Sequence, residues 1–287
     1  MTQTQAVPEK HDKESTSQYE LGSRISTLFA EELVKQSGIA QFSQKPLVIF
    51  DNACGTGAVS SALHRTLKDE TTRSWQLTCG DISEAMVEAT KQKMNKEGWR
   101  NAEVKVVDSQ DTRLQSAQYT HIFSAFAFNI FPDGQAALKE FFNQEVYSLF
   151  QQGIQNFNSL AVWITLIQSA IARISDDLPI PTTDDLFRVY NKNWADETSI
   201  HAQFEQAGFV DIKITIVPKQ YPLPVQELAE ICKISLPHVT KFWTQQQRDL
   251  HYNEVPKMVL RILEEKMGKN GLASMEAEAF IATAKKP

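Results

Sequence analysis

Long hydrophobic runs, cysteine and excess positive charge are all scarce in this sequence. The most apolar stretch, residues 159–174, is interrupted by polar side chains and is shorter than the roughly 20 apolar residues that span a bilayer. Residues 1–17 are polar and lack the apolar core of a secretory signal. These absences predict a soluble cytoplasmic protein that does not enter a membrane.

Cysteine and histidine are too few and too scattered to predict a disulfide framework or a metal centre. The cysteines, Cys54, Cys79 and Cys232, form no C-x-x-C pair, and their odd number favours a reducing compartment. None of the six histidines stands at metal-ligand spacing from another histidine or a cysteine, so no metal is expected. The net charge of −6, with Lys and Arg scattered, also argues against nucleic acid as a partner.

Strand-like and helix-like segments alternate through the chain, whose 42% hydrophobic and 22% charged residues are typical of a globular protein. Short apolar runs predict strands, and apolar residues spaced three or four apart predict helices. The expected strands are 47–50, 75–79, 102–107, 119–126 and 160–166, with helices over 19–39, 58–67, 86–94 and from 134 to about 150. This alternation predicts βαβ units and a parallel sheet with right-handed crossovers.

The last third of the chain has a different pattern. A helix is expected over 198–207, a strand over 210–217, mostly helices over 219–269, and a final strand over 277–284. The low hydrophobicity of residues 1–17 predicts a flexible N-terminus. The remaining residues, 18–287, are expected to form one domain.

The most informative segment is Asp51–Gly57, Asp-Asn-Ala-Cys-Gly-Thr-Gly, between the first expected strand and a helix. Gly55 and Gly57 lack a Cβ and can adopt positive φ, so a ligand can approach the backbone closely. The N–H groups at the start of the following helix suit a carboxylate or a phosphate. A P-loop would need Lys and then Ser or Thr after the second glycine, and a nicotinamide site would prefer a third glycine. The sequence has neither.

Two further acids, Asp81 and Asp108, end the next two expected strands. A carboxylate at Asp81 can accept hydrogen bonds from both hydroxyls of a ribose. Because parallel strands end at one edge of a sheet, we expect Asp51, Asp81 and Asp108 to face a common crevice. Taken singly, such an acid is more often a helix cap or turn former, and Cys54 is more often a small buried hydrophobe than a nucleophile. The prediction depends on their joint occurrence in this order.

The pattern Asp-x-Ala-x-Gly-x-Gly at 51–57 resembles the first motif of class I S-adenosylmethionine-dependent methyltransferases, although Ala53 stands where many members carry glycine. Residues 78–83 and 106–110 resemble the corresponding segments of fungal secondary-metabolite methyltransferases, in particular the gliotoxin bis-thiomethyltransferase group. Residues 21–30 resemble the cap helix of small-molecule methyltransferases of the ubiquinone-biosynthesis type. The likeness covers about residues 20–217 and the last strand.

This resemblance implies S-adenosylmethionine (SAM) as the cofactor and an α/β fold, with a Rossmann-like seven-stranded sheet, helices on both faces and a helical substrate cap. The core would comprise about 44–217 and 274–287, and the cap helices about 18–43 and 219–270. In the family, an acid at Asp108 accepts a hydrogen bond from the adenine amino group. The implied cofactor residues are Asp51, Ala53, Cys54, Gly55, Thr56, Gly57, Asp81, Ile82, Met86, Asp108, Ser109 and Phe126.

The methyl acceptor is predicted less directly. The methyl carbon of SAM is already electrophilic, so the protein mainly aligns the incoming nucleophile, which can supply about 7 to 11 kcal/mol at the extreme. A thiol, with a pKa near 8.5, ionises easily, whereas an alcohol needs a base such as His within about 3 Å. Candidate pocket residues are Asn129, Phe131, Trp163, Trp194, His238, Phe242 and His251, although a structural or surface role is more common for each histidine.

An aromatic-lined pocket suits a small cyclic metabolite. The working hypothesis is methyl transfer to a thiol of a fungal-type secondary metabolite by a monomer or homodimer. Transfer to nitrogen or oxygen is the runner-up. A cofactor-binding subunit without transfer activity, and more distantly a nicotinamide oxidoreductase, are the alternatives from other classes.

Overall fold

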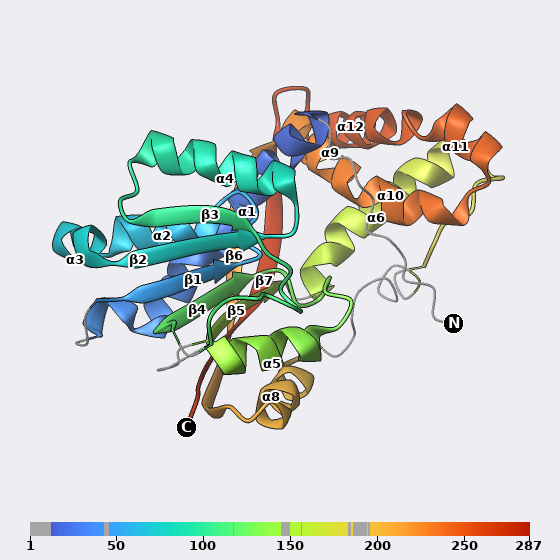
Figure 1. Ribbon diagram of the computed structural model, residues 1–287. Helices are drawn as coiled ribbons and strands as arrows, with labels where there is room; N and C mark the ends of the chain where they lie inside the picture. Colours follow the sequence, from blue (N-terminus) through green and yellow to red (C-terminus); the bar gives the residue numbers. More distant parts are fainter. Residues whose placement is uncertain are drawn as a thin grey trace.

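The computed structural model describes residues 13–42, 46–116, 118–144, 150–155, 157–182, 185, 194 and 196–287. A central sheet carries helices on both faces, and further helices extend beyond one end of the sheet (Figure 1). None of the described helices is long and apolar enough to cross a membrane.

The sheet contains the strands β1 (Val48–Asn52), β2 (Gln76–Asp81), β3 (Ala102–Val106), β4 (His121–Ala125), β5 (Phe150–Gln155), β6 (Val210–Pro224) and β7 (Leu272–Lys285). Their order is β3-β2-β1-β4-β5-β7-β6. Strands β1 to β5 pair in parallel, and β7 runs antiparallel to both β5 and β6. The predicted α/β fold with a parallel sheet is confirmed.

Alternating side chains of the strands separate two apolar clusters, one on each face of the sheet. One face, where Ile49 and Leu77 point, is covered by α1 (Lys13–Ser37), α2 (Ala58–Thr66) and α4 (Glu84–Glu97), with the short α3 (Asp69–Ser74) nearby. The other face, where Phe50 and Ile122 point, is covered by α5 (Gly134–Gln144) and α8 (Glu197–Gln206). Because helices cover both faces, β1, β2 and β4 are buried along almost their whole length.

The third apolar cluster lies mainly among helices beyond the sheet and also includes Phe29 of α1 and residues of β6 and β7. We call these helices the helical layer. The helical layer comprises α6 (Phe157–Ile174), α9 (Val225–Cys232), α10 (Leu236–Val239), α11 (Gln245–His251) and α12 (Glu254–Met267), with the 3₁₀ turns η3 (Lys233–Ser235) and η4 (Thr240–Phe242). Strands β6 and β7 pair from Val210 to Pro224, whereas among the described residues β7 pairs with β5 over Ala279–Ala284. The remaining ribbon of β6 and β7 therefore projects past β5 and carries α9–α12 at its tip (Figure 1).

Three predicted elements are wrong. Residues 160–166 belong to α6, and the fifth strand is β5, ten residues earlier in the chain. A short apolar run can be a strand or part of a buried helix, and here it continues to helical length. Helix α5 ends at Gln144, and Gly153, the expected end of that helix, lies within β5. Residues 219–224, expected to be mostly helical, extend β6.

The N-terminal helix is longer than its apolar spacing predicted. Helix α1 begins at Lys13, inside the segment that the sequence assigned to a flexible N-terminus, and Gly38 follows its end with a φ of 67°. The first 12 residues lie outside the described part of the chain. Helix α1 packs along the sheet face that also carries α2.

Candidate active site

The carboxyl ends of the central strands meet at one edge of the sheet, where the glycine turn leaves β1. Asn52 lies in register with Gly80 of β2 and with Ser124 of β4. Directly after it, Ala53, Gly55 and Gly57 all adopt positive φ, of 50°, 52° and 76°. Two of these three positions are glycines, because a residue without a Cβ adopts this left-handed conformation with little strain. The turn ends where α2 begins.

Asp81, at the end of β2, is joined directly to the glycine turn. Its carboxylate accepts hydrogen bonds from the Gly55 N–H at 2.9 Å and from the Ser83 N–H at 3.0 Å. Thr90 of α4 donates to the Gly55 carbonyl at 2.7 Å and fixes the turn from the other side. A carboxylate has about four acceptor positions, so Asp81 retains the capacity to bind ligand hydroxyls. Asp81 therefore lies beside the glycine turn.

Ile82, next to Asp81, is 55% exposed although it is a large aliphatic residue. An exposed aliphatic side chain beside a buried carboxylate suits a ligand with an apolar ring and sugar hydroxyls. Met86 follows on α4 and is buried. Ile82 and Asp81 thus have the chemistry that an adenosine group requires.

Asp51 lies near the end of β1 and is hydrogen-bonded to the helix that follows the glycine turn. It shares a face of β1 with Ile49, is 1% exposed, and accepts hydrogen bonds from both the N–H and the hydroxyl of Ser60 in α2. The Ser60 contacts join its carboxylate to the first turn of α2, and the Asp81 carboxylate is close enough to interact with it electrostatically. Burial raises the pKa of Asp51 to about 7, against the lowering effect of the Ser60 hydrogen bonds. The interpretation of Asp51 as a helix-capping acid fits this geometry.

The two cysteines near the turn are both buried, and burial raises the pKa of the Cys54 and Cys79 thiols well above the ordinary value. The Cys79 sulfur lies 3.1 Å from the Ser60 hydroxyl oxygen. Because the thiolate is the nucleophile, a raised pKa argues against a covalent role. Cys54 and Cys79 pack as small apolar side chains.

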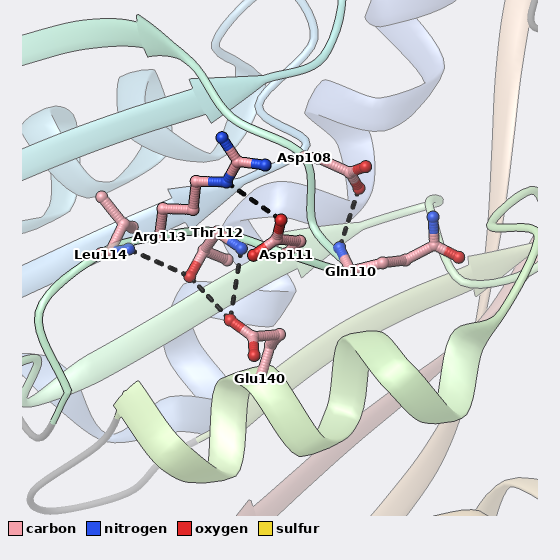
Figure 2. Close-up of polar contacts among 7 residues, drawn as sticks. All are labelled: Asp108, Gln110, Asp111, Thr112, Arg113, Leu114 and Glu140. Carbon is pink, nitrogen blue, oxygen red and sulfur yellow. Dashed lines mark hydrogen bonds and ion pairs between the residues drawn. The ribbon is translucent and has the colours of Figure 1, made fainter.

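The loop after β3 carries Asp108 and Ser109, and Figure 2 shows its polar contacts. The Asp108 carboxylate accepts from the Gln110 N–H at 2.9 Å. Ser109 is buried, and its hydroxyl accepts a hydrogen bond from the Asn52 side-chain amide at 3.0 Å. Asn52 immediately precedes the glycine turn, so this bond joins the two loops across the end of β2.

Phe126, at the end of β4, connects the sheet edge to the helical layer. It has a positive φ of 57°, which is uncommon for a bulky residue and is found more often at functional positions. Its ring lies edge-on to Phe29 of α1, with centroids 5.7 Å apart, and packs against the apolar cluster of the helical layer. Phe126 therefore touches both parts of the molecule.

The predicted acceptor-pocket residues separate into two groups. Asn129, Phe131 and Trp194 lie near the β4–α5 connection, where Phe128 contacts both aromatic rings. Trp194 is 1% exposed within the apolar cluster beneath α5, which is a core position. Asn129 is 7% exposed.

The other candidates lie in the helical layer. Phe242 is 40% exposed on η4, and His251 of α11 pairs with Glu254 at 2.6 Å. Helix α11 lies at the end of the layer far from the sheet (Figure 1), so the structure does not bring His251 to the strand ends. The side chains of Trp163 and His238 lie outside the described part of the structure.

Several buried oxygen atoms at this edge have no hydrogen-bond partner within the described residues. They are the side-chain oxygens of Asn52, Thr56, Ser124 and Asn129. Burying such an atom unpaired costs about 1 to 3 kcal/mol, so each is expected to meet a ligand or an ordered water. Across the described ranges, no three His, Cys, Asp or Glu side chains gather in a way that could hold a metal ion.

Sequence reasoning missed Asn52, Gln110, Thr112 and Glu140, which hold the loop after β3. Asn52 could have been found as a polar residue ending a buried strand. The others offer no local signal, because their partners lie 23 and 28 residues away.

Comparisons with known proteins agree with this geometry. The methyltransferase domain family matches residues 49–144. Methyltransferase ktnA of Aspergillus niger is 60% identical over the full length of both chains. Acetylaranotin bis-thiomethyltransferase of Aspergillus terreus is 37% identical over 96% of this chain and 95% of its own.

Among solved structures, a methyltransferase from Bacillus halodurans has a TM-score of 0.55 at 13% identity, over 89% of this chain and 98% of its own, which shows a shared fold. The 60% identity over both full chains goes further and shows the family. The protein belongs to the class I SAM-dependent methyltransferases of the fungal secondary-metabolite type.

Proposed function

We propose that this enzyme transfers the methyl group of SAM to a thiol of a small secondary metabolite. The acceptor would bind between the carboxyl edge of the sheet and the helical layer. The observation that carries the cofactor half is the bond from the Gly55 N–H to the Asp81 carboxylate, which joins the two motifs that bind the cofactor in this family. When bound, SAM supplies an electrophilic methyl carbon on a sulfonium.

The cofactor site we propose follows the chemistry of the edge. Asp81 would accept from the ribose hydroxyls, Ile82 and Met86 would contact the adenine, and the turn N–H groups would bind the amino-acid tail. The other residues of the proposed site are Ala53, Cys54, Gly55, Thr56, Gly57, Asp108, Ser109 and Phe126. Asp51 would support the turn through Ser60.

The helical layer is well placed to cover an acceptor. Phe126 meets its apolar cluster as well as Phe29 of α1, so an acceptor near Phe126 would be screened from water. Exclusion of water strengthens alignment of the nucleophile and favours a compact apolar metabolite over a polymer. We infer that this layer is the substrate cap.

Asn129 is the polar residue we assign to the acceptor. Its side-chain oxygen is buried without a partner, on the loop that follows β4 and Phe126. An amide oxygen there would accept a hydrogen bond from the acceptor and orient its nucleophilic atom. Such an interaction aligns the acceptor without removing its proton.

A thiol acceptor fits the histidines that the structure describes. His121 is buried at the start of β4, His64 packs near Trp75 and Trp99, and His201 and His251 pair with carboxylates on helices away from the strand ends. A thiol ionises near neutral pH without a dedicated base, whereas an alcohol needs one within about 3 Å. The bis-thiomethyltransferase name of one relative points the same way.

A panel of acceptors tests the proposal. The purified enzyme is incubated with methyl-labelled SAM and a set of small dithiols, amines and phenols. Label on the dithiols supports the proposed acceptor class. Turnover of phenols or amines with inert dithiols would reassign the acceptor to oxygen or nitrogen, and Asn129→Ala should then still reduce turnover more than it reduces cofactor affinity.

The cofactor site has its own test. Asp81→Ala removes the carboxylate proposed for the ribose and should weaken binding of S-adenosylhomocysteine by about 30-fold or more, about 2 kcal/mol, in calorimetry. An unchanged affinity would overturn the site assignment. Asp69→Ala, which removes an exposed carboxylate paired with Arg73 on α3, is the control and should bind within about threefold of the wild type.

A further inference from the structure

The loop after β3 is fixed to three different elements. The Asn52 side-chain amide donates to the Ser109 hydroxyl and ties the loop to the end of β1. The Asp133 N–H donates to the Gln110 side-chain oxygen at 2.7 Å and ties it to the connection between β4 and α5. Glu140 of α5 accepts from Thr112 and ties its far end to the helix.

The Glu140 contact has the strongest chemistry of the three. One carboxylate oxygen accepts from the Thr112 hydroxyl at 2.8 Å and from the Thr112 N–H at 3.2 Å. Hydrogen bonds to an ionised acceptor are roughly twice as strong as neutral ones. Figure 2 shows Glu140 reaching from α5 toward Thr112, while Arg113 points away from this helix.

The loop needs such a fixed point because its backbone is irregular. Over residues 107–116 it has no regular strand or helix outside the isolated bridge between Asp108 and Asp111, and Arg113 adopts a positive φ of 52°. Thr112 is nevertheless 5% exposed, so the loop is packed down at this position. A loop that is ordered before a ligand binds does not lose that freedom on binding.

We propose that Glu140 is a positioning residue for the adenine end of the cofactor site. It holds Thr112, and thereby Asp108 and Ser109, in the conformation that meets the adenine. This inference rests on the proposed placement of adenine beside Asp108 and Ser109. Glu140 itself touches no cofactor atom in this assignment.

Calorimetry with two probes, S-adenosylhomocysteine and 5′-methylthioadenosine, tests the role. Both contain adenine, but only the first has the amino-acid tail that the glycine turn would bind. Glu140→Leu should weaken the binding of both probes by a similar factor, about tenfold, because the lost contact acts on the adenine end of the site. Glu140→Gln keeps an oxygen for Thr112 and should recover affinity to within about threefold of the wild type.

Asp111→Ala is the matched control. It removes a carboxylate from the same loop, but the Asp111 side chain pairs only with the largely exposed Arg113 among the contacts described, at 3.0 Å. Its affinity for both probes should stay within about twofold of the wild type. Equal weakening in Asp111→Ala and Glu140→Leu would attribute the effect to lost negative charge and overturn the proposal.

A second pair of variants covers the case in which Glu140→Leu folds poorly. Thr112→Val removes the hydroxyl at nearly constant volume and should weaken the binding of both probes. Thr112→Ser keeps a hydroxyl and should bind both probes with nearly wild-type affinity. Wild-type affinity in Thr112→Val and Glu140→Leu, with affinity lost in Asp81→Ala, would overturn only this inference. Wild-type affinity in Asp81→Ala as well would overturn the cofactor site on which it rests.

Discussion

At the carboxyl edge of the sheet, buried polar groups hold one another by hydrogen bonds, whereas the helical layer is held mainly by apolar packing. Asp81 and Asp51 each accept at least two hydrogen bonds at the edge. The layer buries a cluster that includes Leu228, Trp243 and Val259. Polar networks tolerate little change in geometry, but apolar clusters of constant volume accept many sequences. We therefore expect the edge to accept fewer substitutions than the helical layer.

The largest expected effect comes from opening a cavity in the helical layer. Trp243 is 3% exposed, and its indole N–H donates to the Pro179 carbonyl at 2.9 Å. Trp243→Ala should cost about 3 to 5 kcal/mol of the free energy of unfolding in urea titrations. If the two regions are held independently, hydrogen exchange should accelerate in α9–α12 and remain slow in β1–β4.

Phe242→Ala is the matched control for this experiment. Phe242 is the neighbouring aromatic residue and is 40% exposed, so its truncation should change stability by no more than about 0.5 kcal/mol. Faster exchange in β1–β4 of Trp243→Ala would show that the layer and the edge are one cooperative unit. The helical layer and the edge would then differ in composition but unfold together.

The next effect tests how closely the edge is packed. A Cβ on Gly80 would lie 2.9 Å from the Phe50 ring and 3.0 Å from the Val107 Cβ, and both residues are buried. Gly80→Ala should therefore destabilise the protein by about 1 to 3 kcal/mol in urea unfolding. It should also weaken S-adenosylhomocysteine binding, because Gly80 directly precedes Asp81.

A double variant checks the cause of this effect. Val107→Ala removes the Val107 Cγ2, which would also lie 3.0 Å from the new methyl group, so Gly80→Ala should cost less in that background than in the wild type. Strictly additive losses would mean that the contact with the Val107 Cγ2 is not what excludes a side chain at this position.

The sequence predicted the edge better than the rest of the molecule because its features are local. The turn at 51–57 and the acid Asp81 stand in fixed order after strands whose apolar runs are evident, and the structure joins them. The orientation of Asp51 was available from strand alternation, since it shares a face with Ile49. The sequence analysis instead assigned Asp51 to the crevice because it stands at the end of an expected strand.

Other features depend on contacts that no local pattern encodes. Strand β5 reads Phe-Gln-Gln-Gly-Ile-Gln, which is polar and contains glycine, and it is defined by pairing with β4 and β7. Residues 160–166 form a short apolar run, and such a run fits a buried strand and a buried helix equally well. The contact of Thr112 with Glu140 spans 28 residues, and only the fold brings the two together.

A pH-dependent effect concerns the charge of Asp51. Its folded pKa of about 7 lies above the ordinary value of 3.8 because the carboxyl is buried. Between about pH 4 and 7 the unfolded chain releases a proton that the folded chain retains, so this group lowers the stability of the protein as the pH rises. Asp51→Asn does not titrate, and its stability relative to the wild type should increase by about 2 to 3 kcal/mol from pH 5 to pH 8.

Asp196 provides a control of opposite sign. The Ser199 N–H lowers its pKa, so its stabilising contribution is present above the ordinary pKa and is lost as the pH falls. Asp196→Asn should therefore lose stability relative to the wild type at neutral pH and lose less in acid. Parallel pH profiles for the two variants in urea unfolding would contradict the burial of Asp51.

The smallest expected effect concerns the ion pair that joins the N-terminal helix to the helical layer. Arg24 of α1 lies 2.5 Å from the Glu227 carboxylate of α9, with 50% and 33% of their side chains exposed. Exposed pairs contribute about 0 to 1 kcal/mol and are screened by salt. Arg24→Ala should therefore reduce stability by less than about 1 kcal/mol in low salt and by almost nothing in 1 M NaCl.

If apolar contact between α1 and the layer dominates, Phe29→Ala should cost several times more in both salts, because Phe29 is 1% exposed and its ring packs on Phe126. A larger loss for Arg24→Ala than for Phe29→Ala would reverse the comparison and show that charge, not packing, holds α1 over the sheet edge.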